Sequence, residues 1–235
     1  FTMKKTHIFI VLILCVGIAG FIIPAFDIER LTAVFNWSII ATLLVVLTVI
    51  AFFYQFELST TNSKEIALIA MLGTISAVLR IPFAAIPNVQ PCTYIIICTG
   101  YVFGPVAGFM VGALTPLVSN FFLGHGPWTP YQMFAWGLAG MTAFFLKQMK
   151  GNRWLLIVFG VIWGYLFGWI MNIWYWTAFI HPLTVQTFFV TQFTTIWFDT
   201  MHAIANAFFL GILGPRTIAI LERFKKRFSW KAVVN

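Results

Sequence analysis

The stretch GYVFGPVAGFMVGALTPLVSNFFLGHGPWTP, residues 100–130, decides the predicted fold. Within it, Gly104-Pro105 is a turn signal between two apolar segments. The residues after the turn are small, as close approach of helices in lipid requires: Ala107, Gly108, Gly112 and Ala113. An uncharged loop rich in Gly, Pro and aromatic residues follows at 120–130. The stretch therefore predicts two packed helices that end in a polar and aromatic loop, an arrangement typical of a binding site.

Composition places the chain in a membrane. Of its 235 residues, 61% are hydrophobic and 9% are charged, and the mean hydropathy is +0.94. Because a soluble domain carries about 25% charged residues, this composition cannot supply a water-solvated surface. We predict an all-α integral membrane protein. The net charge of +8 does not indicate nucleic-acid binding, since the basic residues gather at the ends of apolar runs.

Apolar runs divide the chain into predicted spans, each of which needs about 20 residues. We predict eight, at residues 7–25, 34–54, 64–82, 92–103, 107–123, 130–146, 154–177 and 185–214. The run at 92–103 is short for a bilayer, so its helix either begins nearer Val89 or lies beside a cavity. Lys4-Lys5 and the first run imitate a signal peptide, but the run has no small-residue cleavage site, and we expect a retained helix.

The basic residues set the predicted orientation. With a cytoplasmic N-terminus, 12 Lys and Arg residues lie on the cytoplasmic side and 2, Arg30 and Arg80, lie outside. Treating 92–123 as one span would turn the basic loop at 147–153 and the basic tail outward, against the positive-inside rule. We therefore expect a multi-pass protein of the cell membrane with both termini in the cytoplasm.

This orientation places three connections outside, at 82–91, 120–130 and 177–184. They and the adjacent helix ends are rich in Pro, aromatic and neutral hydrogen-bonding side chains. Trp and Tyr also gather at membrane surfaces as interfacial belts, which is the alternative for any single aromatic. As a set, these residues predict a substrate pocket formed by Arg80, Asn88, Gln90, Asn120, His125, Trp128, Tyr131, Gln132, Asn172, Tyr175 and Trp176.

Five polar residues in the last run fall at spacings of 3, 4, 3 and 4, which places them on one helix face: Gln192, Thr195, Asp199, His202 and Asn206. A carboxylate at the bilayer centre costs about 2.5–3.5 kcal/mol, so Asp199 should face the bundle interior. A proton relay through Asp199 and His202 is one interpretation. The alternatives are an interhelical hydrogen-bond clamp and a cavity wall, and we expect Asp199 to be a structural or wall residue.

Motifs of the common enzyme and channel classes are missing from the sequence. It contains no Walker-type phosphate loop, HExxH or nucleophile elbow, and no filter motif or ring of like charges. Cys15, Cys92 and Cys98 are scattered, which argues against a disulfide framework or a metal site. We expect no catalytic residues, cofactor or metal. A membrane-embedded binding protein driven by a partner fits best, and an enzyme that uses Asp199 and His202 is the alternative.

From Lys64 onward the sequence resembles the substrate-binding S component of an energy-coupling factor (ECF) transporter. The resemblance lies in KEIALIAMLGTISAVLRIPF, AAIPNVQPCTYIIICTGYVFGPVAGFMVGALTPLVSNFFLG and HGPWTPYQMFAWGLAGM. It implies a six-helix core at 63–215, an N-terminal extension with two spans at 1–62 and a basic cytoplasmic tail at 216–235. The loops IPNVQP and GHGPWTPYQMFAWG are most similar to the cobalamin-specific S component of lactobacilli.

The resemblance also implies a function. An S component binds a vitamin-like compound from outside, docks on a transmembrane T component with two cytoplasmic ATPases, and topples in the membrane to release the compound inside. Docking in this family uses a small-xxx-small motif on the first core helix, which corresponds to Gly73 and Ala77, with Ala70 one turn earlier. Gly73 stands where the family usually has alanine. The alternative role of these residues is packing against the N-terminal spans.

The residue types on the outer side predict the charge and size of the substrate without use of the family resemblance. An anionic substrate would need Arg or Lys, and Arg80 alone is available in the outer part of the core. Many amide, hydroxyl and aromatic groups suit a bulky neutral molecule, and the amide-fringed corrin of cobalamin (vitamin B12) fits this description. Another neutral vitamin or a nucleoside-like compound is the alternative. His125, His181 and Cys92 are the outer groups that could reach a cobalt, with loop hydrogen bonds or a buried thiol as the competing roles.

Overall fold

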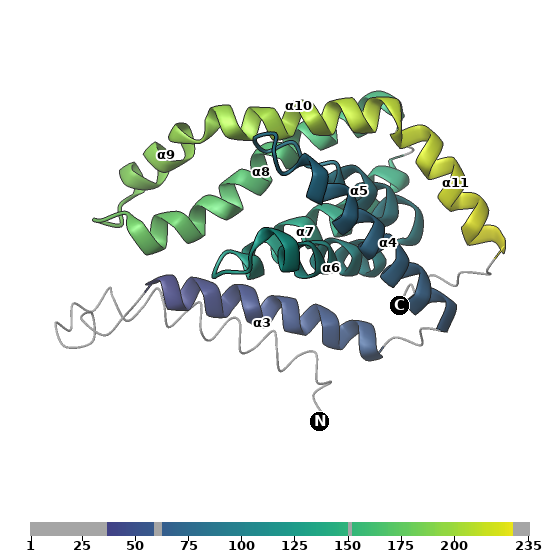
Figure 1. Cartoon of the computed structure of the whole chain (residues 1–235), viewed down its shortest axis with the longest axis horizontal. Coiled ribbons are helices and arrows are strands. Elements are labelled where there is room, and N and C mark those ends of the chain that lie inside the picture. Colours follow the sequence, from purple (N-terminus) through teal and green to yellow (C-terminus); the bar gives the residue numbers. More distant parts are fainter. Residues whose placement is uncertain (1–36, 59–62, 150–151, 228–235) are drawn as a thin grey trace.

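The computed structural model describes residues 37–58, 63–149 and 152–227, and Figure 1 shows them as a bundle of helices. No described residue lies in a strand, so the predicted all-α fold is confirmed for this part of the chain. The predicted first span at 7–25 lies outside it. The helices are α3 (Trp37–Leu58), α4 (Ser63–Phe83), α5 (Cys92–Phe103), α6 (Pro105–Leu123), α7 (Thr129–Gln148), α8 (Arg153–Phe179), α9 (Val185–Thr194), α10 (Ile196–Ile212) and α11 (Gly214–Arg227).

The predicted turn at Gly104-Pro105 separates α5 from α6. Gly104 has a φ of 103°, in the left-handed region that favours glycine, and its N–H donates to the Gly100 carbonyl at 3.0 Å. Pro105 is the first residue of α6, a position whose backbone N–H makes no hydrogen bond within the helix, so proline costs nothing there. Because a single residue joins the two helices, they fold back directly against each other.

Helices α6 and α7 are in backbone contact. A Cβ atom added to Gly108 would overlap the carbonyl of Gly140, and one added to Gly140 would overlap the carbonyl of Gly108. A Cβ on Gly112 would likewise overlap the backbone of Trp136. Small residues permit this approach. The sequence identified the small face of α6, and the structure shows that α7 is the helix most closely packed against it.

Helix α5 is the centre of the bundle. Its side chains are nearly all buried, and Cys92, Ile96, Ile97 and Cys98 are completely inaccessible. Helices α4, α6, α7, α8, α10 and α11 pack around it. Its 12 residues give a length of about 18 Å, well below the roughly 30 Å of a hydrocarbon core. The helix begins at Cys92, so the expected start nearer Val89 is wrong; the loop before it borders a cavity at Asn88 and Gln90, but no residue of α5 lines that cavity.

The predicted single helix at 185–214 is wrong, because Thr195 breaks it into α9 and α10. Threonine hydroxyls compete with the helix backbone before the break. Thr191 Oγ1 donates to the Thr187 carbonyl at 2.8 Å, and Thr194 Oγ1 donates to the Thr191 carbonyl at 2.8 Å. Beyond the break, α10 lies along α8, as Figure 1 also shows.

Among the described residues, three helices are long and apolar enough to cross a membrane, namely α4, α6 and α8. Helices α10 and α11 could form a fourth, bent span, with 59° between them. The count of eight spans and the division into core and extension stay predictions. Helix α11 occupies most of the predicted basic tail, and Lys225 Nζ donates to the Val102 carbonyl of α5 at 2.7 Å.

Helix α3, from the predicted N-terminal extension, packs against α6, α7 and α8. The hydroxyl oxygens of Thr42 on α3 and Tyr131 on α7 are 3.2 Å apart and share a hydrogen bond. Figure 1 shows α3 along one side of the bundle, with α10 along the opposite side.

We expect Gly108→Ala to lower the free energy of unfolding by about 1–3 kcal/mol, because the new methyl group overlaps a backbone carbonyl that cannot turn aside. The measurement is thermal or denaturant unfolding of the purified protein in detergent. Gly214→Ala is the matched control, because its Cβ would lie an ordinary 3.7 Å from Leu210. Equal stability of the two variants would contradict the backbone contact between α6 and α7.

Candidate functional site

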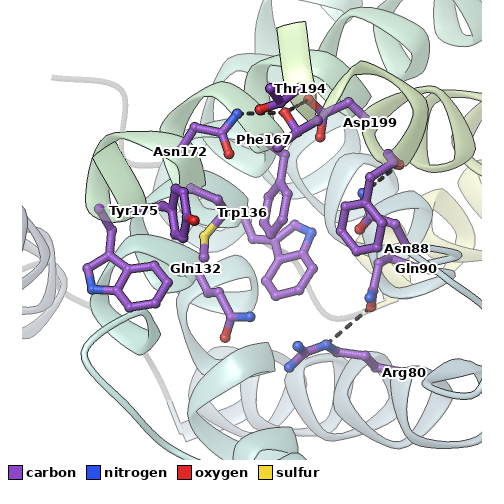
Figure 2. Close-up of a pocket in the computed structure, with 15 residues that line it drawn as sticks. Arg80, Asn88, Gln90, Gln132, Trp136, Phe167, Asn172, Tyr175, Thr194 and Asp199 are labelled. Atoms are coloured by element: carbon purple, nitrogen blue, oxygen red, sulfur yellow. Dashed lines mark hydrogen bonds between the residues drawn. The ribbon is translucent and has the colours of Figure 1, made fainter. Parts of the chain in front are cut away.

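A cavity of about 500 Å³ lies between one end of α4, α7 and α8 and the region where α9 meets α10 (Figure 2). Its walls combine amide and hydroxyl groups with aromatic rings, one guanidinium and one carboxylate. Clefts of this size and composition are typical of small-molecule sites. The lining residues are Arg80, Asn88, Gln90, Gln132, Trp136, Phe167, Gly168, Met171, Asn172, Trp174, Tyr175, Thr194, Thr195, Phe198 and Asp199.

Arg80, in the last turn of α4, supplies the cationic part of the wall. Its Nη1 donates to Ser119 Oγ at 2.7 Å and to Asn120 Oδ1 at 2.6 Å, both on α6. Its Nε donates to Gln90 Oε1 at 3.2 Å. The guanidinium carbon lies 4.9 Å from the centroid of the Trp136 ring, within the range of a cation–π contact. These neutral partners satisfy part of the hydrogen-bonding requirement of a buried cation.

Asn120 connects Arg80 to helix α7 from behind the cavity wall. Its Nδ2 donates to Gln132 Oε1 at 2.8 Å and to Thr129 Oγ1 at 3.1 Å. Thr129 Oγ1 also accepts from the backbone N–H of Gly126 at 3.2 Å. The α6–α7 loop is therefore tied to the same network that holds Arg80 and orients Gln132.

Trp136 and Phe167 form the aromatic part of the wall, with ring centroids 4.5 Å apart. The indole N–H of Trp136 donates to Thr93 Oγ1 at 3.0 Å. Thr93 Oγ1 in turn lies 2.8 Å from Nε2 of His202, and that imidazole packs edge-to-face with Phe167, with 5.0 Å between ring centroids. The rings are thus held in place by polar contacts on the side away from the cavity.

Asp199 supplies the anionic part of the wall, at the start of α10. Its Oδ2 accepts from Thr195 Oγ1 at 3.0 Å. Asn172 on α8 donates to the same Thr195 oxygen at 2.7 Å and to Gln192 Oε1 at 2.9 Å. The facing residue on α8 is Gly168, where an added Cβ would overlap the carboxylate. The glycine therefore provides the room that the acid occupies.

The loop between α4 and α5 closes another side of the cavity. Asn88 has a φ of 53°, and asparagine tolerates this left-handed conformation better than most residues. Its Nδ2 donates to the carbonyl of Phe198 at 2.9 Å, which fastens the loop to α10. Asn88 thus serves both as a wall residue and as a tie between helices that are distant in sequence.

The structure brings together part of the predicted pocket. Arg80, Asn88, Gln90, Gln132, Asn172 and Tyr175 line the cavity. Asn120 is buried behind it, in the hydrogen-bond network of Arg80.

Four predicted pocket residues do not line the cavity. His125 is exposed on the α6–α7 loop and packs against Phe121. Trp128 packs edge-on against the cavity residue Trp174, with 5.5 Å between ring centroids. Tyr131 is buried toward α3, and Trp176 donates its indole N–H to Thr187 Oγ1 of α9 at 3.0 Å. Each of these four side chains contacts another part of the protein, and their predicted role in substrate binding stays a prediction.

Several wall residues were not predicted, and they are mostly apolar: Trp136, Phe167, Gly168, Met171, Trp174, Thr194 and Phe198. In a chain so rich in aromatics, no local pattern separates a ring that faces a cavity from one that faces lipid. Asp199 and Thr195 did carry a signal, namely their place in the polar stripe, and the expectation that Asp199 is a wall residue agrees with its position.

The polar stripe is divided between two helices, yet Gln192, Asp199, His202 and Asn206 are all buried, as the spacing predicted. No hydrogen bond joins Asp199 to His202 within the described residues, because Asp199 bonds to Thr195 and His202 bonds to Thr93. Asn206 Nδ2 donates to the Gly160 carbonyl of α8 at 3.0 Å, as an interhelical clamp would. The direct relay pair is therefore not formed.

The three groups considered for cobalt do not reach the cavity. Cys92 is completely buried inside the bundle, while His125 and His181 are exposed on loops. Among the described residues, no three His, Cys, Asp or Glu side chains are grouped as a metal site requires.

The predicted docking motif on α4 is only partly exposed. Ala77 is completely buried, and Gly73 is buried against α6, where an added Cβ would lie 3.1 Å from Leu114 Cβ. Ala70 faces outward. Gly73 thus packs against α6, and Ala77 is buried within the described part of the chain; the first of the N-terminal spans in the predicted alternative lies outside the described residues.

Comparison with known proteins finds a family model and a relative for this chain. The family model described as "ECF transporter, substrate-specific component" matches residues 64–227. A UPF0397 protein of Vibrio atlanticus (strain LGP32) is 25% identical over 97 residues, which make up 39% of this chain and 53% of the relative. The chain thus spans about half the length of the curated relative that it matches. No solved structure matches the chain.

We expect Asn120→Leu to lower the free energy of unfolding by about 1–3 kcal/mol, since it strips a hydrogen-bond partner from both Arg80 and Gln132 in a buried position. Unfolding of the detergent-solubilised protein measures this loss. Gln148→Leu, at an exposed position on the last turn of α7, is the control and should change stability little. A stable Asn120→Leu protein would show that the network behind the cavity is dispensable.

Proposed function

The chain belongs to the family of ECF transporter substrate-specific components, and on this premise we propose that it captures a vitamin-like molecule in the cavity beside Arg80 and Asp199. Members of this family are substrate-binding transporter subunits, not enzymes, and they work with a T component and ATPase subunits. The proposed cycle is binding from outside, docking on the T component and release inside, with ATP hydrolysed by two partner ATPases.

The observation that carries this proposal is the convergence of polar and aromatic side chains on one cavity. Arg80 lies in the last turn of α4, Gln132 in the first turn of α7 and Asn172 in the second half of α8. These helix ends belong to the side that the distribution of basic residues assigns to the exterior. A cavity near the outer surface supports capture from outside, and both termini would then lie in the cytoplasm.

We propose cobalamin as the substrate, because the sequence resemblance indicates it and because amide side chains from three parts of the chain line the cavity: Asn88, Gln90, Gln132 and Asn172. The volume of about 500 Å³ favours a second candidate, a smaller vitamin or nucleoside-like compound that fits within the cavity. Cobalamin would place one edge inside and leave the rest of its corrin between the outer loops.

A growth assay tests both the function and the substrate. A cobalamin auxotroph without its own importer should grow on low cobalamin when it expresses this chain together with the T component and both ATPases. It should not grow with the chain alone. If growth fails while expression and assembly are normal, cobalamin is the wrong substrate. Binding of a panel of smaller vitamins to the purified protein, measured by calorimetry, then identifies the second candidate.

The outward face of α4 is the proposed docking surface, with Ala70 at its centre and Ala67 and Thr74 exposed one turn away on either side. Small side chains on this face would let a helix of the T component come close. The docking role proposed here therefore shifts from Gly73 and Ala77 to the residues that the structure exposes.

We expect Ala70→Trp to reduce uptake by the assembled transporter at least tenfold while substrate affinity of the isolated chain changes little. A bulky ring on this face would hold the partner helix away, whereas the cavity lies at the far end of α4. Val158→Trp is the matched control, since Val158 is 51% exposed on α8, away from the proposed surface. Equal uptake by both variants would remove α4 from the docking interface.

A further inference from the structure

We propose that the cavity recognises its ligand through two opposite charges that the protein leaves unpaired, with Asp199 receiving an N–H-rich edge and Arg80 receiving an oxyanion. This inference rests on the proposed function of the cavity and specifies the chemistry of the substrate. The ligand would be a molecule that carries amide or amino groups on one side and a phosphate or carboxylate oxygen on the other.

Asp199 is the acidic half of this recognition. Its side chain is 2% exposed and lines the cavity, yet within the described residues its carboxylate accepts one hydrogen bond, from Thr195. A carboxylate can accept about four. Gly168 opposite it leaves room for the acid but supplies no donor side chain. The remaining acceptor capacity of Asp199 is therefore free for N–H groups of a ligand.

Arg80 is the basic half. Its printed partners are neutral oxygens, which bond to Nε and Nη1 and leave the two N–H groups of Nη2 without a partner in the described part of the protein. Its charge is opposed by dipoles and by the face of Trp136. An oxyanion at Nη2 would add a charge-assisted hydrogen bond, which is roughly twice as strong as a neutral one.

The two charges do not neutralise each other. Within the described part of the chain, an ion pair within 4.0 Å joins Lys147 to Glu222, whereas neither Arg80 nor Asp199 takes part in one. Figure 2 shows Arg80 and Asp199 on opposite sides of the cavity, with Trp136 and Phe167 between them. Buried charges are costly unless they are paired. A ligand that spans the cavity would pair both at once, with its flat part against the rings.

Two kinds of molecule carry this chemistry. A corrinoid with a nucleotide loop has side-chain amides and a phosphodiester. A phosphorylated amino-heterocycle has an amino group and a phosphate on a smaller frame, which fits a cavity of about 500 Å³. The probes are therefore two pairs that differ in the phosphate: cyanocobalamin with dicyanocobinamide, and thiamine monophosphate with thiamine.

The experiment measures binding of all four probes to the purified full chain by calorimetry, for the wild type and for Asp199→Asn and Arg80→Gln. At least one pair should bind the wild type, and its phosphate-bearing member should bind more tightly. Asp199→Asn should weaken that member at least tenfold, which is about 1.4 kcal/mol. Arg80→Gln should abolish the preference for phosphate within the pair.

Thermal unfolding without ligand separates recognition from structure. Because Asp199→Asn removes an unpaired buried charge, the ligand-free variant should unfold at the same temperature as the wild type or higher, while its affinity falls. Glu222→Gln removes a carboxylate that is 44% exposed and far from the cavity, and it should leave binding unchanged.

Three results would overturn the inference. They are no binding of either pair to the wild type, an unchanged affinity in Asp199→Asn, or a loss of affinity in Asp199→Asn that the control Glu222→Gln shows equally. If the assembled transporter nevertheless imports a vitamin that lacks one of the two groups, the proposed function stands and the two-charge recognition fails. If binding follows the prediction but no uptake occurs with the partners present, the failure lies in the proposed transport role.

Discussion

The buried guanidinium of Arg80 is the interaction on which the architecture of the cavity depends. A cation inside an apolar bundle must be surrounded by acceptors, and here they come from α6 and from the loop before α5, with the ring of Trp136 on α7 adding its face. Satisfying one charge therefore fixes four segments relative to one another. The polar network that results also orients Gln132, so that the stability of the helix ends and the shape of the cavity have the same origin.

The contact between α6 and α7 at their glycines differs from this network, because it is made by backbone atoms. Gly108 and Gly140 let the two helices touch at backbone level, whereas the side chains of Asn120 and Gln132 join the same helices near the cavity. The helices are thus close at the glycines and joined through long side chains at the cavity end. The bundle can therefore contain a cavity at one end of these helices while the helices stay closely packed at the glycines.

The sequence predicted the helices and several wall residues because both follow from simple physical limits. Gly104 accepts a positive φ and Pro105 cannot continue a preceding helix, so this pair predicts a turn. Amides such as Asn88 and Asn172 are costly in lipid unless they face a cavity or a partner. The break at Thr195 could not be predicted, since threonine hydroxyls either tolerate or interrupt a helix according to their surroundings. The choice between Trp136, which lines the cavity, and Trp176, which does not, depends on tertiary packing alone. For the same reason, the sequence alone could not predict that Gly73 and Ala77 face the interior, because their burial depends on how the helices pack.

The enclosed position of α5 has a consequence for how the protein is made. A segment of 12 residues is too short to be held across a bilayer by its own contact with lipid, and a single residue, Gly104, connects it to α6. Insertion of α5 and α6 together, as one hairpin, would meet this limit during biosynthesis. The central helix of the folded protein is then shorter than a segment that spans a bilayer by itself, and it depends on its neighbour from the moment of insertion.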